Sequence, residues 1–69
     1  MKIKFGKMAE KHGYILHLQV LESSNGFYIG TFNAEGPISR ESEEYFSSYA
    51  SAQSALENDE FTQVETLFD

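Results

Sequence analysis

Histidine and hydroxyl side chains are the residues of this chain that could support metal binding or catalysis. His12 and His17 are its two histidines, and it contains no cysteine. A structural zinc site needs about four ligands. Side chains five residues apart on one strand point to opposite faces. We therefore expect surface or pairing roles for both histidines, with no metal site and no cofactor.

The hydroxyls of Tyr28, Ser39, Ser42 and Tyr45 lie in one stretch of the sequence. A serine nucleophile needs a base and an oxyanion-stabilising group within hydrogen-bond range. The chain contains no G-x-S-x-G elbow, and no histidine stands at a recognisable spacing from these serines. We expect capping and turn hydrogen bonds from the serines, and we expect that the protein is not an enzyme.

Arg40 is the only arginine, and it lies among acidic residues. Its guanidinium could fork onto a nearby carboxylate and fix a turn. Alternatively, it could face a carboxylate or phosphate of a ligand. The structural interpretation is preferred, and the carboxylates available for it are those of Glu35, Glu41, Glu43 and Glu44.

Charge is unevenly distributed along the chain. Residues 1–34 carry four lysines and two glutamates (net +2), whereas residues 35–69 carry one arginine and nine acidic residues (net −8), which together give −6. This balance argues against direct nucleic-acid binding, because each phosphate contact requires a cation. The acidic residues form either a solvated face or a docking surface for a basic partner. They are Glu41, Glu43, Glu44, Glu57, Asp59 and Glu60.

Six phenylalanines and four tyrosines are more aromatic residues than one small core can hide. We expect Tyr49, Phe61 and Phe68 to be half exposed, and exposed apolar patches commonly mark interfaces. The expected partner is another protein or a second copy of the chain, as a homodimer. The candidate interaction residues are Arg40, Glu41, Glu43, Glu44, Tyr49 and Phe61.

Hydrophobic alternation and turn residues predict the elements that position these side chains. Strands are expected at residues 1–5, 14–21, 27–32 and 42–46, with a helical turn at 8–11 and a helix from Ser47 or Ser48 to about Glu57. Asn25-Gly26 predicts a type I′ hairpin. A second turn is expected at residues 33–37, and Gly30 indicates a bulge or the close approach of another backbone.

The expected fold is therefore α+β: an antiparallel sheet of three to four strands with one helix packed on one face. Residues 1–69 form a single small domain, in which residues 61–69 are a short helical turn or a frayed tail. No secretory signal or membrane-spanning stretch is apparent, so we expect a cytoplasmic protein with no membrane partner.

Half of the chain resembles a known pattern. Tyr28-Ile29-Gly30-Thr31, Gly36-Pro37-Ile38-Ser39-Arg40-Glu41-Ser42, Tyr45-Phe46 and Ala52-x-x-Ala55-Leu56 are similar to a family of small uncharacterised bacterial proteins with the pattern Y-I-G-T … G-P-x-S-R-x-S … Y-F … A-x-x-A-L. That family tends to end its motif with an aromatic residue, Gln and Arg, whereas here Val64 follows Gln63. The resemblance implies no activity.

These observations predict a small non-enzymatic protein-interaction module. The alternative function is an acidic decoy that inhibits a nucleic-acid-binding protein. Binding of a decoy should be displaced by DNA or RNA and should weaken as salt is added.

Overall fold

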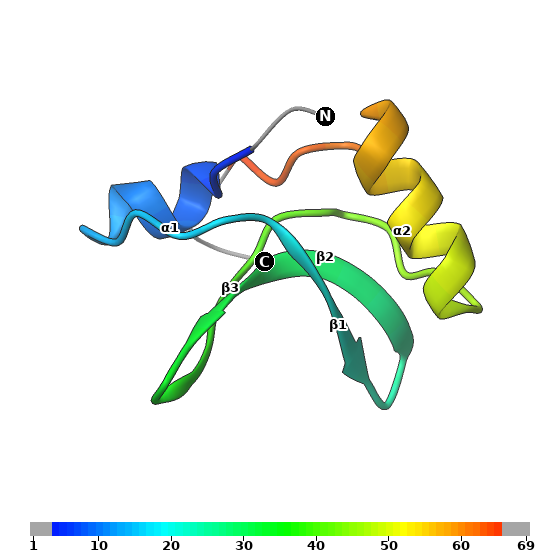
Figure 1. Cartoon of the computed structure of the whole chain (residues 1–69), viewed down its shortest axis with the longest axis horizontal. Helices are drawn as coiled ribbons and strands as arrows, with labels where there is room; N and C mark the ends of the chain where they lie inside the picture. Colours follow the sequence, from blue (N-terminus) through cyan, green and yellow to red (C-terminus); the bar gives the residue numbers. More distant parts are fainter. Residues whose placement is uncertain (1–3, 66–69) are drawn as a thin grey trace.

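One antiparallel sheet and two helices make up the computed structural model, which describes residues 4–65 (Figure 1). The elements are α1 (Lys7–Lys11), β1 (Gln19–Ser23), β2 (Gly26–Asn33), β3 (Gly36–Arg40) and α2 (Tyr49–Asn58). The strand order is β1-β2-β3, and α2 packs on the sheet. The α+β fold is therefore confirmed, with three strands in the sheet.

The β1–β2 hairpin lies where Asn25-Gly26 predicted one, but its turn is displaced by one residue. Ser23 pairs with Gly26, which leaves Ser24 and Asn25 at the tip. Positive φ occurs at Gly26 (121°) and not at Asn25, so the predicted type I′ turn, which needs positive φ at both central residues, is wrong. The Ser23 hydroxyl accepts a hydrogen bond from the Asn25 amide at 3.1 Å and stabilises this tip.

The β2–β3 hairpin is built in the same way. Asn33 pairs with Gly36, whose φ is 119°, so Ala34 and Glu35 form the tip. Here the Asn33 side-chain oxygen accepts a hydrogen bond from the Glu35 amide at 2.8 Å. The turn predicted at residues 33–37 is therefore shorter than expected, and Pro37 belongs to β3.

The strand predicted at residues 14–21 is regular only from Gln19 onward. Before it, the chain pairs briefly with the N-terminal segment: Phe5 bridges to His17, and the Leu18 amide donates to the Lys4 carbonyl. This pairing is short because α1 begins at Lys7. The predicted helical turn at 8–11 is confirmed by α1, whereas residues 1–3 of the predicted first strand lie outside the described residues.

The third strand lies earlier in the chain than the predicted 42–46. After Arg40, the amides of Glu41 and Ser42 both donate to the Ile29 carbonyl, at 2.8 and 2.9 Å, which interrupts the regular ladder. Phe46 then pairs with Phe27 as an isolated bridge. The segment predicted as a strand therefore follows β2 without forming a continuous one.

Helix α2 begins and ends where local signals place it. The Ser48 hydroxyl accepts a hydrogen bond from the Ser51 amide at 3.1 Å, as an N-cap does. The helix ends at Asp59, which adopts a left-handed conformation with φ 59°. Ala52 and Ala55 are buried, so the predicted small-residue face is the one that packs.

The N-terminal segment holds the C-terminal end of α2. The Lys4 ammonium donates to the Leu56 carbonyl at 3.1 Å and forms an ion pair with Asp59 at 3.2 Å. A cation is favourable there because the last carbonyls of a helix carry partial negative charge.

The two faces of the sheet differ in what covers them. Figure 1 shows α1 and α2 on the same side, which we call the covered face, and no helix on the other side, which we call the open face. Ile29 and Thr31 point to the covered face and are completely buried. By alternation and register, the open face carries Gln19, Leu21, Tyr28, Gly30, Phe32 and Arg40.

The last described residues do not form the predicted helical turn. Gln63 bridges to Ser42 in antiparallel fashion, and the Val64 amide donates to the Glu41 carbonyl at 2.8 Å. Residues 61–65 are therefore an extended segment, and residues 66–69 of the predicted turn or tail lie outside the described part of the chain. Of the helices that the structure describes, none has the length and apolar character needed to cross a membrane.

Candidate interaction surface

Tyr28, Arg40 and Tyr45 form a cluster on the open face, which we call the tyrosine–arginine cluster. Arg40 Nη1 donates to the Tyr45 hydroxyl at 3.0 Å, and the guanidinium carbon lies 5.5 Å from the centre of the Tyr45 ring. The rings of Tyr28 and Tyr45 meet edge to face, with centroids 6.0 Å apart. The ring contacts and the hydrogen bond orient the guanidinium against an aromatic surface.

The pKa of Tyr28 reflects this environment. Burial raises the pKa of the Tyr28 hydroxyl, the neighbouring Tyr45 raises it further, and Arg40 lowers it; the net result is a raised pKa. The hydroxyl therefore stays protonated at neutral pH, and the cluster carries the single positive charge of Arg40.

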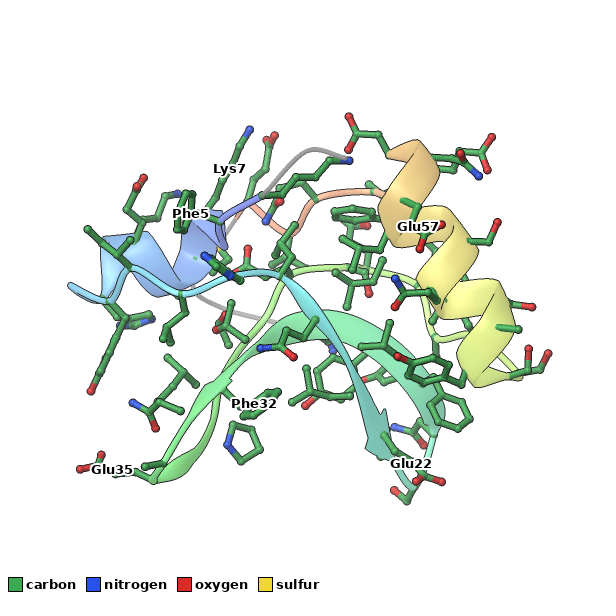
Figure 2. All side chains as sticks on the ribbon, in the orientation of Figure 1. Phe5, Lys7, Glu22, Phe32, Glu35 and Glu57 are labelled. Atoms are coloured by element: carbon green, nitrogen blue, oxygen red, sulfur yellow. The ribbon has the colours of Figure 1, made fainter. Side chains whose placement is uncertain are left out.

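Gly30 and Phe32 continue the open face along β2. A Cβ atom at Gly30 would collide with the Ser39 carbonyl oxygen and lie 3.0 Å from the Tyr28 ring. The predicted close approach of another backbone at Gly30 is therefore confirmed. Phe32 is 42% exposed, and Figure 2 shows it on the side of the sheet away from both helices.

The carboxylate of Glu41 lies inside the protein, on the covered face, although Glu41 follows Arg40 directly. Its side chain is completely buried. The Met8 amide donates to both oxygens at 3.0 Å, and the Ala9 amide donates to Oε2 at 3.0 Å. The carboxylate thus accepts the otherwise unpaired amides at the start of α1.

Two side chains complete the set of donors around Glu41. Ser39 Oγ donates to Oε2 at 2.6 Å, and Gln63 Nε2 donates to Oε1 at 2.7 Å. Thr31 Oγ1 lies 2.6 Å from Ser39 Oγ, and it must be the donor because the Ser39 hydrogen is used by Glu41. We call these residues the Glu41 network; it joins α1, β2, β3 and the C-terminal segment.

The neutral donors keep Glu41 ionised. Burial by itself raises the pKa of Glu41, but the hydrogen bonds, that of the Met8 amide foremost, outweigh burial and hold the pKa below its ordinary value of 4.5. A charged carboxylate without a contacting cation is tolerated here because several donors share its charge.

Glu44 makes a second, more exposed connection to the C-terminal segment. Its carboxylate accepts hydrogen bonds from the Thr62 amide, at 2.9 and 3.1 Å, and from the Thr62 hydroxyl at 2.7 Å. Burial raises the pKa of Glu44, but these hydrogen bonds outweigh burial and leave the pKa lowered.

These contacts change the interpretation of Arg40. Glu41 and Glu44, two of the four predicted carboxylate partners, are bound by other donors. Glu35 lies at the opposite end of β3 (Figure 2), roughly 16 Å along the strand from Arg40 at ~3.3 Å per residue. The described partner of Arg40 is Tyr45, so an aromatic residue takes the role that a carboxylate was expected to play.

The predicted interaction residues are not brought together on one surface. Glu41 is buried, which removes it from any docking surface, whereas Glu43 is exposed. Tyr49 is 56% exposed and lies at the start of α2, where it meets the Phe27 ring at 6.2 Å. Phe61 is half-buried beyond the far end of α2.

Sequence reasoning named the hydroxyls of Tyr28 and Tyr45 but did not include these residues, or Phe32, in the interaction surface. Alternation along β2 was the available signal, because Tyr28 and Phe32 share one face of that strand. Tyr45 gave no such signal, since the irregular segment after Arg40 decides its direction.

No group of three or more acidic, histidine or cysteine side chains within residues 4–65 could hold a metal ion. The chain matches no protein-family model, no curated protein and no solved structure.

Proposed function

We propose that this protein is a non-enzymatic interaction module and that another protein binds its open face. One observation carries the proposal: Tyr28, Phe32, Arg40 and Tyr45 lie together on a sheet face on which no described helix packs. Tyrosine, phenylalanine and arginine are enriched in protein interfaces. Exposed apolar patches on small domains commonly serve such contacts.

The contacts of the serines support a role without catalysis. Ser39 donates to Glu41, and Ser42 accepts a hydrogen bond from the Ile29 amide at 3.0 Å while donating to the Glu44 carbonyl at 2.9 Å. Both hydroxyls therefore satisfy buried or half-buried polar groups of the fold, as expected of structural serines.

A different protein suits the open face better than a second copy of this chain. Two copies packed through their open faces about a two-fold axis would bring their Arg40 guanidinium groups toward each other. Each copy also carries a net charge of −6, so long-range repulsion opposes self-association. A homodimer is therefore the less favoured partner.

The acidic-decoy alternative has less support. Glu41 is buried, Glu44 is bonded to Thr62 and Asp59 is paired with Lys4. Three of the six acidic residues expected to form the docking surface thus have partners within the protein, so the remaining charge resembles an ordinary solvated surface.

Affinity capture from the native host, followed by mass spectrometry, tests the proposal when three baits are compared. The baits are the unaltered protein, Phe32→Ser on the open face and Tyr49→Ser as a matched control. Tyr49 is also an exposed aromatic residue, but it lies on α2. We expect a partner that is retained by the unaltered protein and by Tyr49→Ser, and lost with Phe32→Ser.

The proposal fails if Phe32→Ser retains every partner, or if Tyr49→Ser loses the same partner to the same extent. Circular dichroism of the three baits excludes unfolding as the cause of a loss. Light scattering that gave a dimer mass abolished by Phe32→Ser would instead assign the open face to self-association.

A further inference from the structure

Arg40 is the only charged residue among the strand positions of the open face. The other positions are Gln19, Leu21, Tyr28, Gly30 and Phe32. The protein as a whole carries a net charge of −6. A partner on this face therefore meets one local positive charge within a negative long-range field. Polyanions such as nucleic acids and anionic lipid surfaces are repelled by that field.

The tyrosine–arginine cluster holds this charge in a defined place. The hydrogen bond from Arg40 Nη1 to the Tyr45 hydroxyl and the ring of Tyr45 beneath the guanidinium limit its freedom. Tyr28 supports Tyr45 from the other side. A guanidinium ordered before binding loses less entropy when a ligand arrives, and its planar fork matches a carboxylate.

Apolar surface extends away from the cluster along β2. Phe32 follows Tyr28 by four residues, or roughly 13 Å at ~3.3 Å per residue. Leu21 pairs with Tyr28 from the neighbouring strand. A side chain bound at Phe32 and another bound at Arg40 would therefore be separated by about four residues of extended chain.

Provided that the open face is the docking surface proposed above, its chemistry defines the partner further. We propose that it binds a short extended segment of another protein, in which a single aspartate or glutamate lies among apolar residues. The carboxylate pairs with Arg40, and an apolar side chain of the segment packs against Phe32. One carboxylate is preferred over several because each additional negative charge is opposed by the net charge of the protein.

Selection from a displayed library of random peptides of about ten residues, long enough to cross the face, tests this chemistry. Enriched peptides are then synthesised in two forms, with the acid and with the corresponding amide. Their affinities are measured by calorimetry against the unaltered protein and against Arg40→Met, which keeps an unbranched apolar side chain. NMR amide shifts locate the binding surface.

We expect enriched peptides with one acidic residue among apolar ones. Replacing the acid by its amide should weaken binding to the unaltered protein about tenfold or more, the value of a charge-assisted hydrogen bond. Arg40→Met should weaken binding of the acid form by a similar factor and should bind both forms equally, because the pair is then already broken. Tyr49→Ser should bind like the unaltered protein.

The alternative outcomes separate the two proposals. Peptides that shift open-face amides but bind equally as acid and amide overturn the preference for a carboxylate and leave the interaction module standing. Peptides that bind tightly elsewhere on the protein overturn the docking surface itself. A library that yields no binding peptide counts against both.

Discussion

Arg40 and Glu41 are neighbours in the sequence, yet they belong to opposite faces of the sheet and to different kinds of structure. Glu41 is completely buried and accepts hydrogen bonds from α1, β3 and the C-terminal segment. Arg40 lies half-buried on the open face against Tyr45. The buried charge connects segments far apart in the sequence, whereas the surface charge is held by residues close to it.

This difference shows how a small chain can divide its ionisable residues between stability and recognition. A domain of this size buries only roughly 60% of the surface of its unfolded chain, so its apolar core is limited. The Glu41 network adds specific connections on the covered face. The open face can then keep its aromatic residues available without contributing much to stability.

Removing the Glu41 carboxylate should have the largest effect. Glu41→Ala leaves the donors from Met8, Ala9, Ser39 and Gln63 without their acceptor, and each buried donor left unsatisfied costs about 1–3 kcal/mol. We expect a loss of at least about 3 kcal/mol in the free energy of unfolding, measured by urea denaturation. Glu43→Gln, at an exposed acid two residues away, is the control and should change it by less than about 0.5 kcal/mol.

Gly30→Ala should have the next largest effect, because it disturbs the one crowded position of the open face. The added methyl group collides with the Ser39 carbonyl oxygen and approaches the Tyr28 ring. Overpacking of this kind costs about 1–3 kcal/mol. An unchanged urea midpoint for Gly30→Ala would show that β2 and β3 can separate there, and the close approach would then lose its structural significance.

Acid should weaken the covered face selectively. The folded-state pKa values of Glu41 and Glu44 lie below the ordinary value of 4.5, so their contribution to stability is present above about pH 4.5 and is lost as the pH falls through the folded-state values. The urea midpoint should be flat from about pH 7 to pH 5 and fall below that range. Glu41→Gln should fall less steeply; an equal slope would exclude Glu41 as the source.

Arg40→Met should have a small effect on stability, in contrast to Glu41→Ala. Its described contacts are one hydrogen bond and one cation–π contact near the surface, each worth about 1 kcal/mol or less at such sites. We expect the free energy of unfolding to fall by no more than about 1 kcal/mol. A loss as large as that of Glu41→Ala would make Arg40 a core residue and would remove the contrast between the two faces.

The smallest predicted effect is a change in the titration of Tyr28. Arg40 lowers the pKa of Tyr28, whereas burial and Tyr45 raise it. Arg40→Met should therefore raise the pKa of Tyr28 further, which NMR of the tyrosine ring carbons can follow at alkaline pH. Tyr14 is an exposed tyrosine outside the cluster and should titrate alike in both proteins.

Local signals were sufficient for much of the fold. The cap at Ser48, the crowding at Gly30 and the position of the first hairpin each depend on a few adjacent residues, which sequence reasoning can evaluate. The interior position of Glu41 could not be predicted in this way. Its donors Met8 and Gln63 lie 33 and 22 residues away, and an isolated glutamate is normally exposed.

The interaction surface was harder to predict than the fold for a related reason. Exposed aromatic residues were expected near Tyr49 and Phe61, at the start and beyond the end of α2, because composition alone does not assign side chains to faces. The open face depends on the register of β2 with its neighbours and on the path of the chain after Arg40, and both are set by long-range pairing.

The shared acceptor at Ile29 determines the reading frame of the segment that follows. In a regular strand, residues 40 and 46 would point to the same side. Here Glu41 and Ser42 both bond to one carbonyl, so the alternation changes phase: Phe46 pairs with Phe27, which alternates with Tyr28 and so faces the covered side, and Tyr45 reaches Arg40. The number of residues between Arg40 and Tyr45 is therefore as much a part of the surface as their identity. A chain that lost one residue in this interval could keep every side chain of the cluster and still fail to assemble it.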